Sequence, residues 1–319
     1  MDLQKIKEIS ESIKDNVGKV IIGKDEKVDL ILASLYAKGH ILLEDIPGTG
    51  KTVLAKAIAK SIDAKFKRIQ FTPDLLPSDI TGSSIFNQVE NKFNFIKGPV
   101  FTNILLADEI NRATPRTQSS LLEVMEEGQV TTDGTTRILD NPFIVIATEN
   151  PIENAGPFPL PEAQNDRFLM KISMGYPSKE EEIKIMNRFI KDDPLSDIGS
   201  VCTKDDIASI QEAIKDIYVH KDIIKYIADI ISKTREDSNI ELGVSPRGTL
   251  ALLKAAQSLA AIKGREYVIP DDIKFLSAPV LSHRIIARNT LNSLEENYLI
   301  INSLVESIDV PTENWREEK

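Results

Sequence analysis

The sequence predicts an α/β protein whose parallel five-stranded sheet is followed by an all-helical domain. Short apolar runs alternate with amphipathic helical segments through the first two thirds of the chain, which is typical of a parallel sheet with helices on both faces. The strand-like runs stop after Tyr176-Pro177. We therefore expect an α/β core over residues 1–177, which begins with a helix, and a helical domain over residues 178–319.

Five segments of the core have the length and composition of strands: His40–Glu44, Phe66–Phe71, Asn103–Ala107, Phe143–Thr148 and Phe168–Ser173. The first, third and fourth are short continuous apolar runs, as expected for central strands covered on both faces. In the second part of the chain, helix starts are marked by a capping box at Ser178–Glu181, a similar pattern at Thr203–Asp206, and a proline after Ser245.

The composition is that of a folded, acidic protein. Apolar residues make up 41% of the chain and charged residues 28%, and the formal net charge is -10 with no dense run of Lys or Arg. Because nucleic-acid phosphates bind clustered basic residues, nucleic acid is a disfavoured partner. The N-terminus carries charges where a secretory signal needs its apolar stretch, and no stretch suits membrane insertion, so we expect a cytoplasmic protein.

The segment that follows the first strand has the pattern of a phosphate-binding loop before a helix. Its residues are Pro47, Gly48, Thr49, Gly50, Lys51 and Thr52. Glycines let backbone N–H groups converge on phosphate oxygens at a helix start; Lys51 is placed to reach the β- and γ-phosphates of ATP, and the Thr52 hydroxyl to bind Mg2+. Asp45 stands where the strict pattern has glycine. The alternative is an ordinary glycine turn before a helix.

Two carboxylates follow the apolar strand at Asn103–Ala107. Asp108 is predicted to hold Mg2+ through water, and Glu109 to orient and deprotonate the water that attacks the γ-phosphate. Taken alone, Asp-Glu after a strand is usually a solvated turn. A phosphate-binding loop upstream favours the catalytic interpretation.

With these motifs in order, the sequence resembles the AAA+ ATPases, and specifically the MoxR family. Five phrases carry the resemblance and span nearly the whole chain: Leu43–Thr52, Asp108–Ala113, Glu149–Pro151, Pro161–Phe168 and Ser245–Arg247. The resemblance implies a P-loop ATPase core, a helical lid domain, and ATP and Mg2+ as cofactors.

The resemblance also assigns roles to residues outside the loop. Asn150 corresponds to the polar sensor that helps to hold the attacking water. Arg167 matches the arginine that family members present to the γ-phosphate of a neighbouring subunit, and Arg247 matches a second sensor for the γ-phosphate of its own subunit. Ile22 and Gly23 correspond to the contact on the adenine side.

Three of these residues have plainer interpretations. Asn150 before Pro151 is a common turn pair, Arg167 is a surface arginine paired with Asp166, and Arg247 follows Ser-Pro at a helix start.

Two further positions depart from the family pattern and are candidates for tuning the rate of turnover. Glu149 stands where many relatives carry glutamine, and Arg116 where lysine is common. Arg112 is placed either to orient Glu109 or reach across an interface, or to lie exposed at a helix start.

Two hairpins are predicted within the core. Asp133-Gly134 is a strong short-range turn signal inside residues 128–139, and Phe93 alternates with Phe95 inside residues 81–96. The resemblance identifies the first as the hairpin before the sensor strand and the second as an insertion in helix 2. In related rings such hairpins face the central pore or one ring surface, while the alternative is two ordinary hairpins on a monomer.

The resemblance implies an ATP-driven homo-oligomer, a hexamer, that acts as a chaperone in remodelling or maturing a protein client. Clients with von Willebrand factor A domains or metal cofactors are the class it suggests. The alternatives are a magnesium-chelatase-like subunit, a nucleic-acid translocase, and a nucleotide-gated binding module without turnover. The acidic charge weighs against the translocase, and Asp108, Glu109 and Asn150 weigh against the module.

Overall fold

The centre of the molecule is a parallel sheet of five strands in the order β2-β5-β8-β1-β9. The computed structural model describes residues 1–44, 48–150, 158–190, 194–288, 290 and 292–311. The sheet strands are β1 (Ile41–Glu44), β2 (Phe66–Gln70), β5 (Ile104–Asp108), β8 (Ile144–Glu149) and β9 (Met170–Ile172). The five predicted strands are therefore confirmed, with each end within about two residues of its expected place.

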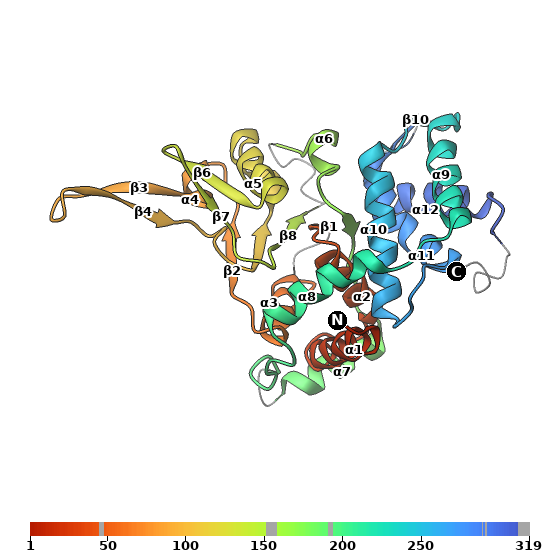
Figure 1. Cartoon of the computed structure of the whole chain (residues 1–319), viewed down its shortest axis with the longest axis horizontal. Coiled ribbons are helices and arrows are strands. Elements are labelled where there is room, and N and C mark those ends of the chain that lie inside the picture. The colour runs from red at the N-terminus through yellow and green to blue at the C-terminus, as the bar shows by residue number, and fades with distance from the viewer. Residues whose placement is uncertain (45–47, 151–157, 191–193, 289, 291, 312–319) are drawn as a thin grey trace.

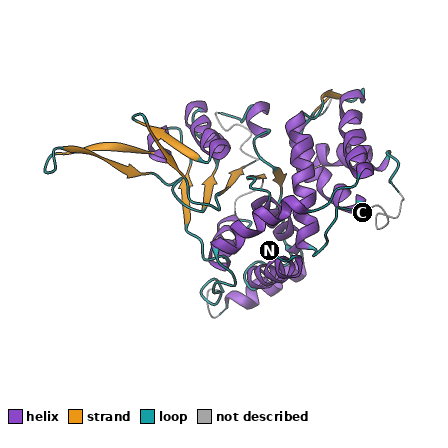
Figure 2. Ribbon diagram, in the orientation of Figure 1, coloured by secondary structure: helices purple, strands orange, loops and turns teal. Residues whose placement is uncertain are grey.

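Helices surround this sheet and form most of the chain after residue 177, as Figures 1 and 2 show. Those before it are α1 (Leu3–Gly18), α2 (Asp25–Tyr36), α3 (Lys51–Ser61), α4 (Pro77–Thr81), α5 (Pro115–Glu127) and α6 (Glu162–Asn165). Those after it are α7 (Lys179–Phe189), α8 (Lys204–Ala213), α9 (Lys221–Glu236), α10 (Pro246–Ile262), α11 (Pro270–Leu281) and α12 (Leu294–Glu306). The three predicted helix starts are confirmed, because Ser178, Thr203 and Ser245 each cap a helix with the side-chain oxygen.

One feature of the second part was not predicted. A small antiparallel pair joins β10 (Ile240–Leu242) to β11 (Ile286–Ala287) within the helical region. Strands of two or three residues carry too little periodicity to be recognised in a sequence.

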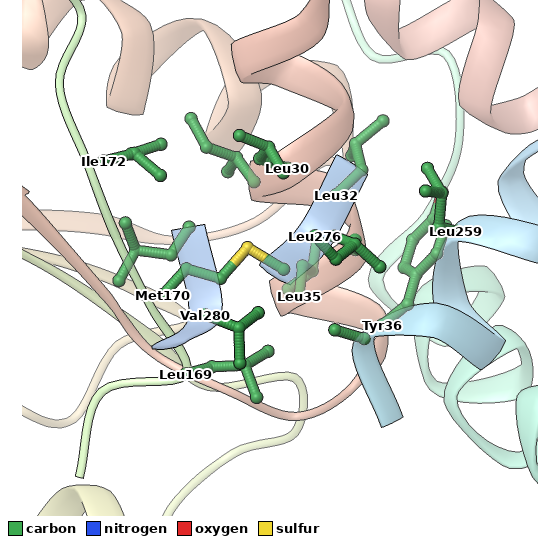
Figure 3. Close-up of a cluster of buried hydrophobic side chains, with 14 of the residues drawn as sticks. Leu30, Leu32, Leu35, Tyr36, Leu169, Met170, Ile172, Leu259, Leu276 and Val280 are labelled. Carbon is green, nitrogen blue, oxygen red and sulfur yellow. The ribbon is translucent and has the colours of Figure 1, made fainter. Parts of the chain in front are cut away.

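The helical region and the sheet share one apolar core, which is centred on α2. Every residue of α2 from Val28 to Tyr36 is buried, because the helix packs against α10 and β9, with side chains of α11 beside them (Figure 3). Figure 3 shows Leu30, Leu35 and Tyr36 among side chains of these three elements. The start of α10 is therefore held against the core, and the division of the chain at residue 177 remains a prediction.

Both predicted hairpins form. They are β3 (Gly82–Asn87) with β4 (Lys92–Lys97), and β6 (Gln129–Thr132) with β7 (Thr135–Ile138). The β3–β4 hairpin projects far from the body (Figure 1) and exposes Phe93 and Val89, the latter by 95%. The Arg137 guanidinium carbon lies 3.8 Å from the Phe95 ring centroid, which links the two hairpins at their base.

Within the described residues, no helix has the length and apolarity needed to cross a membrane. The sheet places the predicted functional segments together for a simple reason. β8 pairs with β1 on one side and with β5 on the other, so all three carboxyl ends open at the same edge. In open parallel sheets, ligands bind at this edge.

Candidate active site

The phosphate-binding loop has the backbone that its glycines predict. Gly48 and Gly50 adopt left-handed φ angles of 88° and 85°, and Gly50 directly precedes the first residue of α3. A side chain at either position would strain the backbone. Lys51 and Thr52 form the first turn of the eleven-residue helix α3, where N–H groups and the helix dipole favour an anion. Asp45 and Pro47 lie outside the described residues.

The segment assigned to the adenine side lies beside this loop. A Cβ atom built on Gly50 would come within 3.6 Å of Ile21 Cδ1, and Ile22 is half-buried next to it. Gly23 has a φ of 71°, and a Cβ there would overlap the Glu181 carboxylate. Residues 21–23 therefore pass between the phosphate loop and the start of α7.

Asp108 ends β5 with both carboxylate oxygens engaged. Oδ1 accepts a 2.6 Å hydrogen bond from Thr148 Oγ1 on β8. Oδ2 accepts two hydrogen bonds from Arg68 on β2, at 2.6 Å from Nη2 and 3.1 Å from Nε. The carboxylate is mostly covered, with 15% of the side chain exposed, so its direction is fixed by strands on both sides.

Glu109 is held in an uncommon backbone conformation at the next position. Its φ is 58°, in the left-handed region that non-glycine residues seldom occupy outside functional or turn sites. Its Oε2 accepts hydrogen bonds from Gln70 Nε2 at 2.7 Å and from Arg112 Nη1 at 2.9 Å. The orienting role predicted for Arg112 therefore agrees with the structure, although its side chain is also 44% exposed.

Three residues around these carboxylates were missed by the sequence interpretation: Arg68, Gln70 and Thr148. Gln70 lies directly opposite Asp108 in the β2–β5 register, and Thr148 also accepts the Glu109 backbone N–H at 2.8 Å. Arg68 and Gln70 alternate on the strand Phe66–Gln70 and so point to one face. The sequence shows this alternation, but it does not show that β2 lies next to β5.

Asn150 follows β8 directly and is 6% exposed. Its position continues the strand that lies between β1 and β5, so it stands between the phosphate loop and the carboxylates. A buried polar side chain at this point fits a residue that holds a water or a phosphate oxygen.

The unusual Glu149 carboxylate is neutralised within the sheet. Lys171 Nζ on β9 lies 3.2 Å from Glu149 Oε2 and also contacts the Glu44 carboxylate at the end of β1. Burial raises the pKa of Glu149, and Lys171 opposes that shift. Burial disfavours the charged amine of Lys171, but Glu149 and Glu44 outweigh it and raise its pKa. The lysine thus ties the sensor strand to the strand that enters the phosphate loop.

Arg167 and Arg247, which we call the arginine pair, lie together. Both contact the carboxylate of Glu126 near the end of α5: Arg167 Nη1 lies 3.1 Å from Oε2, and Arg247 Nη2 is paired with Oε1. The alternative that Arg167 pairs with Asp166 is wrong, because Asp166 Oδ1 accepts a 2.7 Å hydrogen bond from Arg284 Nε.

Arg284 fixes the arginine pair on a common framework. Its side chain is 2% exposed and donates to the backbone carbonyl of Phe168 at 2.6 Å as well as to Asp166. The other oxygen of Asp166 accepts from Ser245 Oγ, which caps α10, at 2.9 Å. Arg167 directly follows Asp166, and Arg247 lies two residues after Ser245, so their backbones cannot separate without breaking these polar contacts.

The arginine pair lies at the opposite edge of the sheet from the phosphate loop. His40, which precedes β1, bonds through Nε2 to the Met125 carbonyl at 2.9 Å, and its own carbonyl accepts from Leu169 N at 2.8 Å. A cavity of about 510 Å3 is lined by His40, Glu126 and the arginine pair. The four residues of β1 separate this cavity from the loop by about 13 Å.

The oxygens at the carboxyl edge suit Mg2+ bound with a nucleotide. Mg2+ prefers hard oxygen ligands and takes several of them from phosphates and water, so the Thr52 hydroxyl and Asp108 carboxylate are a fitting pair. Because both Asp108 oxygens already accept hydrogen bonds, contact through water fits the geometry. Among the described residues, no atom lies within 4 Å of a Cβ built on Gly48, so this side of the loop has room for a phosphate.

Comparison with known proteins identifies the class that this fold and site define. Residues 40–170 match the model of the ATPase family associated with various cellular activities (AAA), and residues 232–302 match the AAA lid domain. The chain shares 40% identity with Chaperone MoxR1 of Mycobacterium tuberculosis, over 93% of this chain and 81% of that protein. The chain belongs to the MoxR family of AAA+ ATPases.

Two further proteins are similar over most of their length. Uncharacterized protein YeaC of Bacillus subtilis is 52% identical over 85% of this chain and 84% of its own. The crystal structure of a candidate ATPase from Cytophaga hutchinsonii superposes with a TM-score of 0.88 at 38% identity, covering 97% of each chain. The predicted fold class is therefore confirmed.

Proposed function

We propose that the chain hydrolyses ATP to ADP and phosphate at a site that a second copy of the chain completes. The observation that carries this proposal is the position of the arginine pair, at the edge of the sheet opposite the phosphate loop. Arginines that stabilise phosphoryl transfer must contact the γ-phosphate. Since these two lie beyond the reach of their own loop, they serve the loop of a neighbour.

Each residue of the carboxyl edge has a role in this proposal. Gly48, Thr49, Gly50 and Lys51 bind the phosphates, and Pro47 belongs to the same loop outside the described residues. Thr52 and Asp108 would hold Mg2+, which supplies charge neutralisation of the phosphates when bound. Ile22 and Gly23 would contact the nucleotide on its adenine side.

Glu109 and Asn150 act on the attacking water. Glu109 orients the water and accepts its proton, and Gln70 and Arg112 keep its carboxylate in place. Asn150 holds the water from the end of the adjacent strand. Arg167 then stabilises the charge that develops on the neighbour's γ-phosphate.

Arg247 changes its role from the one expected. The resemblance implies that Arg247 contacts the γ-phosphate of its own subunit. In the structure, Arg247 contacts Glu126, which also contacts Arg167. The framework of Asp166, Ser245 and Arg284 keeps the two arginines side by side. We infer that Arg247 faces the neighbouring subunit together with Arg167.

The work driven by this ATPase is proposed to be chaperone-like remodelling or maturation of a protein client. Support comes from the similarity to a chaperone of the same family and from the projecting β3–β4 hairpin with its exposed apolar side chains. A hexameric ring, a cytoplasmic location and clients with von Willebrand factor A domains follow from the family resemblance alone, and they are part of the proposal.

The proposal is tested by measuring ATPase activity per subunit while the protein is diluted through its assembly midpoint. Mass photometry of the same samples gives the assembled fraction. Activity should follow that fraction, and Arg167→Ala should lose it while Arg288→Ala, which removes an exposed arginine after β11, keeps it. Full activity in the monomeric fraction would contradict the shared site.

A further inference from the structure

Glu126 receives both members of the arginine pair on its two carboxylate oxygens. Arg167 contacts Oε2 and Arg247 contacts Oε1, so the single carboxylate uses both of its oxygens. The two arginines come from different parts of the chain, before β9 and at the start of α10. Glu126 is thus the residue through which the side chains of the pair are joined.

On one side, Glu126 faces a cavity whose charged lining is mostly basic. Its cavity is also lined by Lys254 and by Lys38, whose amine is paired with Glu212 at 2.9 Å. The other carboxylate of the cavity, Asp166, is already neutralised by Arg284. Without the charge of Glu126, the described wall of this cavity would present Arg167, Arg247 and Lys254 to an anion. Such a wall suits an anion with several oxygens, and guanidinium groups bind phosphate and carboxylate with similar geometry.

The contacts of Glu126 can be exchanged without moving the backbone. The side chains of Arg167 and Arg247 are 32% and 42% exposed, and that of Glu126 is 42% exposed, so all three reach solvent. The backbone beneath them is fixed by the buried Arg284. Only side-chain rotations are therefore needed for the arginines to pass from one anion to another.

We propose that Glu126 occupies the arginine pair in place of the neighbouring subunit's γ-phosphate, and that exchange between the two makes assembly depend on ATP. This inference rests on the proposed shared site and adds a residue that regulates it. In a free subunit, Glu126 neutralises the pair. At an interface, the γ-phosphate of the neighbouring subunit displaces Glu126 from the arginine pair. The Glu126 carboxylate therefore opposes ATP-dependent association.

A purely structural ion pair predicts a different outcome from a competing one. If Glu126 only stabilises its own subunit, removal of its charge slightly lowers the stability of the subunit and leaves the ATP concentration needed for assembly unchanged. If Glu126 competes with the γ-phosphate, removal of its charge makes the arginines more available, and assembly needs less ATP.

The experiment compares Glu126→Gln with Glu123→Gln, both placed on the Glu109→Gln protein so that ATP is retained. Glu123 is exposed on the same helix, and no ion pair joins it to the described residues. Sedimentation velocity at a fixed subunit concentration gives the ATP concentration at half-maximal assembly. Glu126→Gln should lower that concentration by about three- to tenfold, as loss of exposed ion pairs allows, and Glu123→Gln should leave it unchanged.

Every other result contradicts the inference. An unchanged or raised ATP requirement for Glu126→Gln, with a normal unfolding curve, would show that Glu126 does not compete with the γ-phosphate. A parent Glu109→Gln protein that fails to assemble with ATP would refute the shared site itself, and this inference with it. A matching shift for Glu123→Gln would assign the effect to net charge.

Discussion

Arg68 on β2 and Asp108 at the end of β5 form a two-bond ion pair, with Nη2 at 2.6 Å and Nε at 3.1 Å from the same carboxylate oxygen. Asp108 is also the carboxylate proposed to hold Mg2+. Arg68 and a bound Mg2+ would therefore compete for the Asp108 carboxylate. Binding of Mg2+ with ATP should weaken this ion pair, and Arg68 should influence how much Mg2+ is needed.

Replacing Arg68 with methionine should increase the apparent affinity for Mg2+. The half-exposed pair contributes at most about 1 kcal/mol, so the Mg2+ concentration at half-maximal binding of a fluorescent ATP analogue should fall by about two- to fivefold. Lys65→Met is the control, because it removes an equal charge whose partner is Asp140. An unchanged requirement in Arg68→Met would show that the pair does not oppose the cation.

Glu109→Gln should abolish turnover and keep ATP bound. The amide preserves the shape and the hydrogen-bonding reach of the side chain but cannot accept the proton of water, so kcat should fall by about a hundredfold or more. The affinity for ATP should stay close to that of the native protein. Steady-state ATPase and equilibrium binding check the two parts, and near-native turnover would remove Glu109 from the role of base.

How much of this site was predictable from sequence depends on the range of each contact. Arg112 lies three residues after Glu109, so contact between them was one of the alternatives open from the sequence. Glycine conformations in the loop and helix caps such as Ser178 are also local, and they were predicted. The apolar strands were recognised because each is buried on both faces.

The unpredicted contacts all join segments that are distant in sequence. Arg68 reaches Asp108 only because β2 lies next to β5, and the sequence of a single strand does not determine its neighbours in the sheet. Glu126 reaches Arg247 over 121 residues, and Arg284 reaches Asp166 over 118. The expected cis position of Arg247 rested on family resemblance, and only the packing of α10 against the core showed its actual neighbours.

Arg284→Met should destabilise the protein strongly. The substitution leaves the Asp166 carboxylate without its buried partner and the Phe168 carbonyl without its donor. Loss of one member of a buried ion pair costs about 3–5 kcal/mol. Chemical denaturation should show that loss, whereas Arg288→Met, an exposed position on the same segment, should change the free energy of unfolding by about 0.5 kcal/mol or less. Equal stabilities of the two variants would contradict the anchoring role.

Stability should fall as the pH falls from about 6.5 to 4. Burial lowers the pKa of His40 to about 4, although the hydrogen bond from Nε2 to the Met125 carbonyl opposes that shift. Nδ1 accepts from Val145 N, which requires that this nitrogen carry no proton in the folded state. In this window the unfolded histidine binds a proton that the folded one excludes, so acid favours unfolding by up to about 3 kcal/mol.

Denaturation curves across that range check this linkage. His40→Asn should lose less stability on acidification than the native protein, although His283, whose pKa burial also lowers, still contributes. The same pH dependence in both proteins would show that His40 is not the group responsible.

The shared site is tested most directly by mixing two inactive variants. Glu109→Gln subunits keep the arginine pair, and Arg167→Ala subunits keep the catalytic glutamate, so each variant alone should have little ATPase activity. Random assembly of equal amounts in a head-to-tail ring places an intact Arg167 against an intact Glu109 at about one interface in four. We predict that mixing restores about that fraction of native activity. A mixture no more active than its two components would contradict the account.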